Sequence, residues 1–214
     1  MYYYMKRKCK HKGGSYMKND VLDELVTKYN GYLLTAEAQK ADISRTYLQK
    51  YVTKNRFKRV ERGIYLAPGK VVDPLYILQL KNAGIVYSHD TALYLHSFIE
   101  KKPVKIEVTV KRGYNATHLR NKGIKPYCVN KEQFESGITN IRTAEGNLVN
   151  VYNEDKTICD TIRRKDEMDC QNFQDVLKKY MRSTNKDIGR LLGYAKIEGI
   201  EKKAKDYIGL MTDL

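Results

Sequence analysis

Five cationic side chains fall within nine residues of the sequence, at Lys54, Arg56, Lys58, Arg59 and Arg62. Ammonium and guanidinium groups at this density suit phosphate oxygens, because each neutralised phosphate releases counterions. Apolar and cationic residues alternate over residues 57–60, and a second apolar segment, 64–66, follows a Glu-Arg-Gly turn. This pattern predicts a β-hairpin. We expect its cations to lie along the phosphate backbone of a nucleic acid.

The segment before this hairpin has side chains suited to reading DNA bases. Ser44 can cap a helix that runs to about Lys54. Apolar residues recur on one side of that helix, which leaves the other side polar and basic. With the cap, that polar side comprises Ser44, Arg45, Thr46, Gln49, Lys50 and Thr53. Side chains of these types reach base edges and phosphates in a major groove.

Two shorter helices are expected upstream of this segment. Residues 21–29 have apolar positions at helical spacing after Asp20, and residues 35–41 follow an apolar edge strand at 32–34. A second helix, a tight turn and a polar third helix make a helix-turn-helix, to which the hairpin adds a wing. We therefore predict a winged helix-turn-helix DNA-binding domain over residues 18–70. The alternative that this unit docks onto a protein stays open.

The distribution of charge also favours a polyanionic partner. The 214-residue chain has 40 Lys and Arg against 25 Asp and Glu, giving a formal charge of +15. Residues 1–70 hold 16 of these cations against 6 acids, so most of the excess lies in the first third of the chain. Such a concentration is typical of a nucleic-acid-binding module.

The first residues, MYYYMKRKCKHKGGSYM, predict a basic flexible arm over residues 1–17, and Met17 offers an alternative translation start. No apolar stretch follows the cations as in a secretory signal, and no apolar run approaches the ~20 residues that span a bilayer. The four cysteines and four histidines lack CxxC, HxxxH and HExxH spacings, and Cys9 and His11 are taken as incidental. We expect a cytoplasmic protein with no membrane partner, metal, cofactor or disulfide framework.

The remaining residues, 71–214, predict strands followed by a run of helices. Pro74 suits the first turn of a helix, and strands are expected at 86–87, 105–110, 125–129 and in a hairpin over 138–152. Helices are expected near 155–164, 171–182, 186–197 and 200–211. The chain is therefore predicted to be α+β, with a mixed α/β C-terminal domain that ends in several helices.

The candidate catalytic residues in this region match no spacing that a known catalytic motif requires. Ser88 is expected to cap a helix with Asp90 in its first turn and His89 exposed. Glu107 and Lys111 have three residues between them, whereas a PD-(D/E)xK nuclease needs a carboxylate-x-lysine order. The acids Glu154, Asp155 and Asp160 are explained by a pair at a helix start and one buried or salt-bridged carboxylate. We expect no catalytic residues and no enzymatic activity.

Two longer stretches of the sequence resemble a known family. The order GYLLTAEAQKADISRTYLQKYVTKNRFKRVERGIYLAP, followed by VYSHDTALYLHSF, is similar to the AbiEi-type antitoxins of bacterial type IV toxin–antitoxin systems, also described as AbiEi family transcriptional regulators. The resemblance covers most of the chain beyond Met17 and is most specific in RGIY and SHDTALYLH. A segment similar to DKTICDTIRR opens the helical tail in the family, where Lys156, Thr157, Asp160 and Arg163 match. We expect these four to be structural, as a capping hydroxyl and an acid–arginine pair.

The resemblance implies two activities linked to phage defence. The winged helix would bind repeats in the promoter of the antitoxin–toxin operon and repress it. The C-terminal antitoxin domain, residues 71–214, would counteract a cognate nucleotidyltransferase-like toxin without a stable complex. The alternative is a stand-alone winged-helix transcriptional regulator whose C-terminal domain senses a ligand or dimerises.

Overall fold

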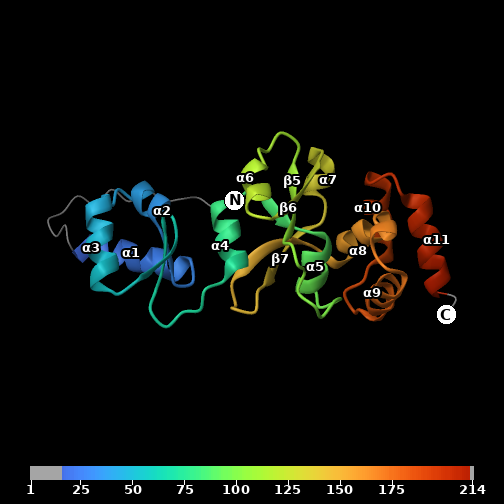
Figure 1. Ribbon diagram of the computed structural model, residues 1–214, viewed down its shortest axis with the longest axis horizontal. Helices are drawn as coiled ribbons and strands as arrows, with labels where there is room; N and C mark the ends of the chain where they lie inside the picture. Colours follow the sequence, from blue (N-terminus) through green and yellow to red (C-terminus); the bar gives the residue numbers. More distant parts are fainter. Residues whose placement is uncertain (1–15, 213–214) are drawn as a thin grey trace. The chain divides into compact units, whose positions relative to one another are not determined.

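The computed structural model describes residues 16–212, and the predicted basic arm up to residue 15, with Cys9 and His11, lies outside them. The chain divides into two compact units, one ending at Val72 and the other beginning at Asp73 (Figure 1). None of the helices within residues 16–212 combines the length and the apolarity needed to span a membrane.

The N-terminal unit consists of three helices and a small antiparallel sheet. The helices are α1 (Tyr16–Lys28), α2 (Thr35–Lys40) and α3 (Arg45–Lys54). The strands are β1 (Tyr32–Leu34), β2 (Lys58–Glu61) and β3 (Ile64–Leu66), in the order β1-β3-β2. The hairpin predicted after the third helix is thus formed by β2 and β3, with β1 along the other edge of β3.

One apolar core holds these elements together. Leu22 from α1, Leu33 from β1 and Ala38 from α2 pack in it with Leu48 and Val52 from α3. All five side chains are buried, so the polar residues between them on α3 are directed outward. The helical spacing of the apolar residues thereby sets which face of α3 is exposed.

The first helix begins earlier than the sequence indicates. It starts at Tyr16 instead of after Asp20, so the last two residues of the predicted arm belong to α1. Contacts with α3 account for the difference, because the Tyr47 hydroxyl donates to Asn19 Oδ1 at 3.0 Å and Lys18 Nζ lies 5.5 Å from the centre of the Tyr47 ring. These contacts hold the first turn of α1 in helical conformation.

The second unit is built on a five-stranded mixed sheet. Its strands are β4 (Ile85–Tyr87), β5 (Glu107–Lys111), β6 (Lys125–Val129), β7 (Ile138–Arg142) and β8 (Leu148–Tyr152), in the order β6-β5-β4-β8-β7. The pairs β4–β5 and β7–β8 are antiparallel, whereas β5–β6 and β4–β8 are parallel. With the helices of both units, these sheets confirm the predicted α+β class.

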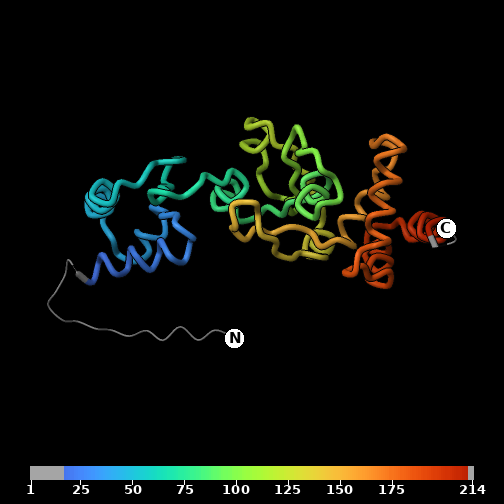
Figure 2. The backbone as a smooth tube through the Cα atoms, turned by 90° about the horizontal axis from the view of Figure 1, so that it is seen from below, coloured from blue at the N-terminus to red at the C-terminus, as the bar shows by residue number. Residues whose placement is uncertain are grey.

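The second unit also contains helices before, between and after these strands. They are α4 (Pro74–Lys81), α5 (His89–Leu95), α6 (Thr117–Asn121), α7 (Lys131–Glu135), α8 (Glu154–Arg163), the 3-10 turn η1 (Lys165–Glu167), α9 (Cys170–Arg182), α10 (Ile188–Ile197) and α11 (Glu201–Thr212). The sequence did not predict α6 and α7, because five residues are too few to display a helical period. Figures 1 and 2 show α8 to α11 gathered at one end of the unit. A shared apolar core there includes Leu93 of α5, Ile158 and Ile162 of α8, Leu177 of α9 and Leu191 of α10.

The boundary at Asp73 is held by side-chain hydrogen bonds. Asp73 caps α4, its Oδ1 accepting from the Tyr76 backbone N–H at 3.0 Å. Its Oδ2 accepts from Thr143 at 2.6 Å and from Asn147 at 2.8 Å, both in the loop between β7 and β8. The first residue of the second unit is therefore tied to a hairpin about 70 residues later.

A buried ionic network lies where α8 meets the end of α10. Lys156 Nζ lies 2.8 Å from Asp160 Oδ1 and 2.6 Å from Glu198 Oε1, and all three side chains are at most 3% exposed. Arg163 Nη2 lies 3.4 Å from Asp160, which confirms the predicted acid–arginine pair. The predicted cap at Thr157 is wrong, because α8 begins one turn earlier and Asn153 caps it by accepting from the Lys156 N–H at 2.9 Å.

Candidate nucleic-acid interface and a cleft in the second unit

The helix α3 is held in place at its start and along its inner face. Its cap is Ser44, as predicted, with Oγ accepting from the Tyr47 backbone N–H at 3.2 Å. On the inner face the Tyr51 hydroxyl donates to the Asp23 carboxylate of α1. Burial and this carboxylate raise the pKa of Tyr51, so the hydroxyl stays protonated as a donor. The outer face is thus presented on a rigid support.

Six of the predicted contact residues form one continuous face. A shallow hollow of about 740 Å³ runs along α3, lined by Arg45, Thr46, Gln49, Lys50, Thr53 and Lys54. All six are exposed, and Gln49 Nε2 donates to Thr53 Oγ1 at 3.4 Å. Arginine, lysine, glutamine and threonine on one exposed helix supply both phosphate contacts and base-edge hydrogen bonds.

The hairpin extends this face. A second hollow of about 440 Å³ is lined by Gln49 and Thr53 of α3 together with Arg56 and Arg59. The turn into β2 places Arg56 in the left-handed region, at a φ of 55°, while Phe57 packs on Tyr51 with ring centres 5.8 Å apart. Ser44, Lys58 and Arg62 are exposed but line neither hollow. We call the exposed residues named in this and the preceding paragraph, from Ser44 to Arg62, the α3–hairpin surface.

Charge on this surface is largely unneutralised. Residues 45–62 contain seven cations and one acid, Glu61. Within the described chain, six of those cations form no ion pair: Arg45, Lys50, Lys54, Arg56, Lys58 and Arg59. The acids Asp20, Asp23 and Glu24 gather instead on α1, around a separate hollow. The unit is therefore electrically polarised, with its free cations on the elements predicted to face nucleic acid.

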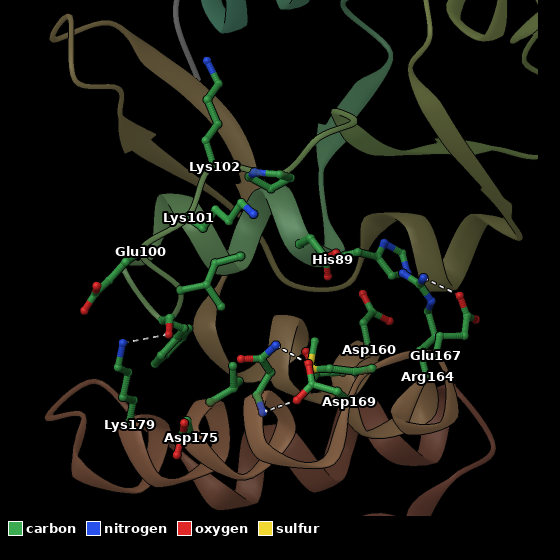
Figure 3. A pocket seen from close by; sticks show the side chains of 18 of the residues that line it. His89, Glu100, Lys101, Lys102, Asp160, Arg164, Glu167, Asp169, Asp175 and Lys179 are labelled. Carbon is green, nitrogen blue, oxygen red and sulfur yellow. Dashed lines mark hydrogen bonds and ion pairs between the residues drawn. The ribbon is translucent and has the colours of Figure 1, made fainter.

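The second unit contains a cleft of about 850 Å³ that the sequence did not indicate (Figure 3). It is lined by the start of α5, the loop over residues 98–104, the end of α8, η1 and α9. Figure 3 shows Lys101, Lys102 and Lys179 toward one end and His89, Arg164 and Glu167 toward the other. Charged side chains thus line both ends of this cleft.

Beside the cleft, Glu107 organises a cluster of polar side chains. Its Oε2 accepts from the Asp90 backbone N–H and its Oε1 from the Tyr127 hydroxyl, each at 2.8 Å. Lys125 Nζ lies 3.2 Å and Arg164 Nη1 3.7 Å from the same Oε1. Burial opposes ionisation of Glu107, but these donors and cations hold its pKa below the usual value. The Glu107 carboxylate therefore binds residues from α5, from β6 and from the end of α8.

His89 lies against this cluster and is 4% exposed. The prediction that His89 is exposed is therefore wrong, because a left-handed φ of 52° turns its ring inward, where it stacks on Tyr127 at 3.7 Å. Ser88 occupies the N-cap position of α5, as predicted, but its side chain makes no capping hydrogen bond, since its Oγ contacts His89 Nδ1 at 2.8 Å and accepts from Thr109 at 2.9 Å. Burial and Arg164 lower the pKa of His89 well below its usual value.

Asp90 and the acids of α8 have distinct surroundings. Asp90 is half-buried and lines the cleft, and burial together with Glu107 raises the pKa of its carboxyl. Asp155 is fully buried and accepts from the Tyr180 hydroxyl at 2.7 Å and the Asp187 N–H at 2.9 Å. Within residues 16–212, no group of three or more His, Cys, Asp or Glu side chains is arranged to hold a metal ion.

Comparisons with known proteins bear on the fold alone. No protein-family model matches the chain, and no curated protein matches it. Among solved structures, the chain is similar to the Rv2827c protein from Mycobacterium tuberculosis, with a TM-score of 0.54 at 9% sequence identity. The alignment covers 92% of this chain and 79% of that one. The likeness thus extends over nearly the whole chain, through both units.

Proposed function

We propose that this protein is an AbiEi-type antitoxin of a type IV toxin–antitoxin system, with a DNA-binding N-terminal unit that represses its own operon. The observation that carries this proposal is the α3–hairpin surface, where six cations without ion pairs in the described chain lie on one helix, the turn after it and the strand that follows. Five of the six line the two adjoining hollows. A folded unit keeps so many unpaired cations on one face at a cost in self-repulsion, which a polyanionic partner relieves.

The proposed binding mode is that of a winged helix. In it, α3 enters the major groove, where Arg45, Gln49 and Lys50 meet base edges and phosphates. The β2–β3 hairpin is the wing, and Lys58, Arg59 and Arg62 follow the phosphate backbone beside that groove. Helix and wing then have separate tasks, since base contacts select sequence and phosphate contacts supply affinity that depends on salt.

The antitoxin half of the proposal rests on the family resemblance. The RGIY segment forms the turn and β3, with Gly63 at a φ of 77°. The SHDTALYLH segment supplies α5 and the residues beside Glu107. We infer that the second unit counteracts a nucleotidyltransferase-like toxin in the cytoplasm, without forming a stable complex with it.

Binding to the protein's own promoter tests the first half. Fluorescence anisotropy with promoter DNA and a scrambled duplex should show salt-dependent binding to both and a preference for the promoter. The Lys58→Gln, Arg59→Gln and Arg62→Gln triple variant should bind both duplexes more weakly. The slope of log K against log salt should fall by about 0.9 for each lost phosphate contact. A loss confined to the promoter duplex would contradict the wing assignment, and no binding of DNA by the parent chain would favour the protein-docking alternative.

Co-expression with the adjacent toxin gene tests the second half. Residues 71–214 retain Asp73 and its bonds to Thr143 and Asn147, so this fragment is expected to fold by itself. It should restore growth in cells that express the toxin while failing to repress the promoter. Absence of rescue by both the fragment and the full chain, with each shown to be folded, would favour a stand-alone regulator instead.

One observation favours that alternative function. The 850 Å³ cleft of the second unit has the size of a small-molecule site, and a buried histidine nitrogen beside it has no partner in the described chain. A regulator that senses a ligand would use such a cleft.

A further inference from the structure

We propose that the cleft of the second unit binds a nucleoside phosphate, with the nucleoside at the end formed by His89 and Asp90 and the phosphates at the end formed by Lys101, Lys102 and α9. This site is separate from the α3–hairpin surface and does not depend on DNA binding.

The first step concerns the hydrogen-bonding state of His89. Ser88 Oγ accepts from Thr109 and lies 2.8 Å from His89 Nδ1. Since the described residues offer the Ser88 proton no other acceptor, we assign Ser88 as the donor to Nδ1. The neutral ring then carries its proton on Nε2. Among the described residues, Nε2 has no hydrogen-bond partner. Buried donors are rarely left unsatisfied in native proteins, so this N–H calls for an acceptor that the chain does not supply.

The second step concerns the neighbours of that N–H. Asp90 offers a half-buried carboxylate without a side-chain partner in the described residues, and Arg164 Nε is a second buried donor lacking one. The Asp90 carboxylate as an acceptor, with His89 Nε2 and Arg164 Nε as donors, could together bind sugar hydroxyls or the edge of a base. A phosphate would be repelled there by Asp90 and Glu167. Because Nε2 is buried, we expect the ligand to shift the Arg164–Glu167 ion pair, which lies beside His89 (Figure 3).

The third step concerns the opposite end of the cleft. The loop over 98–104 and α9 contribute five cations to the lining: Lys101, Lys102, Lys178, Lys179 and Arg182. Glu100, Asp169 and Asp175 are the acids of the same elements, which leaves an excess of two cations. Asp169 is occupied as the cap of α9, accepting from the Asn172 N–H at 2.9 Å. Exposed lysines around a cleft suit the oxygens of a polyphosphate.

Apolar side chains also line the cleft. They include Ile99, Pro103 and Met168, which are each partly exposed. They offer a surface for the flat face of a base. A polar end, an apolar wall and a cationic end within about 850 Å³ match the parts of a nucleoside phosphate better than those of an inorganic anion.

Isothermal titration calorimetry on the full-length protein tests this assignment, with ATP, GTP, CTP, UTP and inorganic tripolyphosphate as probes. At least one nucleotide should bind at least about tenfold more tightly than tripolyphosphate. His89→Phe keeps the stacking on Tyr127 but removes the N–H, and should weaken that nucleotide about tenfold. Asp90→Ala, which retains the backbone N–H to Glu107, should do the same, and both variants should bind tripolyphosphate as the parent does.

A charge-matched pair of variants completes the test. Lys101→Gln with Lys102→Gln should weaken both kinds of probe, whereas Lys131→Gln with Lys202→Gln, two exposed lysines away from the cleft, should change neither. Equal binding of tripolyphosphate and all nucleotides would reduce the site to a cationic rim and overturn the proposal. Binding of an RNA oligonucleotide with none of the mononucleotides, or no binding by the folded parent chain, would overturn it as well.

Discussion

Reversing the charge of Arg45 and Lys50 together is expected to abolish selective binding to the promoter. Both side chains lie on the exposed face of α3, and neither forms an ion pair in the described chain, so nothing in the fold depends on their charge. Each good contact to a base contributes about 1–3 kcal/mol, and a glutamate would add repulsion from the phosphates. The Arg45→Glu, Lys50→Glu variant should therefore bind promoter DNA at least about 100-fold more weakly at constant salt.

The control for this experiment has the same change in net charge. Lys131→Glu with Lys202→Glu reverses two exposed lysines of the second unit and should leave promoter affinity nearly unchanged. Fluorescence anisotropy at a single salt concentration compares the two variants. If both lose affinity to the same extent, net charge alone governs binding and α3 is not the recognition helix. Unchanged affinity of the α3 variant would remove the basis for the proposed DNA-binding mode.

The elements of the N-terminal unit could be predicted from sequence because their signals are local. Ser44 stands immediately before α3 and caps it through a residue three positions later. The buried positions of α3, among them Leu48 and Val52, recur at helical spacing, so the exposed face follows directly. The Gly63 turn likewise separates β2 from β3 within a few residues. The early start of α1 was missed because it depends on Tyr47, 28 residues from its partner Asn19.

The cleft of the second unit could not be predicted in this way. His89, Glu107 and Tyr127 belong to α5, β5 and β6, and Arg164 follows α8. Only the antiparallel β4–β5 pair and the parallel β5–β6 pair bring the first three together. No spacing along the chain encodes that arrangement. The one available signal was the SHDTALYLH segment, whose His89 and Asp90 turn out to lie beside Glu107. A positive φ at a histidine, which reverses the direction of its side chain, has no sequence signature.

Buried charges in the second unit are likewise paired between residues far apart in the sequence. Lys156 is held between Asp160, one turn later on α8, and Glu198, 42 residues away, and none of the three side chains is more than 3% exposed. Burial opposes the charge on Lys156, but the two carboxylates raise its pKa above the usual value. The two carboxylates and Lys156 therefore neutralise one another, and Arg163 is the second cation of the network, at 3.4 Å from Asp160 and 3.3 Å from Glu198.

Removing that lysine is expected to destabilise the second unit strongly. The Lys156→Ala variant leaves two buried carboxylates with the partly exposed Arg163 as the remaining cation of the network. Removing one partner of a buried ion pair costs about 3–5 kcal/mol. A urea titration followed by far-UV circular dichroism suits a chain without tryptophan. In the variant, the second unit should unfold at a lower urea concentration than in the parent chain. The N-terminal unit should unfold at the same urea concentration in both and serves as the control. Two buried carboxylates that share one cation repel each other, which raises the pKa of the pair, so protons stabilise the folded variant. Its loss of stability should therefore shrink as the pH falls from 7 toward about 5. Adding Asp160→Asn and Glu198→Gln should recover most of the lost free energy of unfolding. If the loss changes neither with pH nor with these two substitutions, then lost packing and not uncompensated charge is responsible.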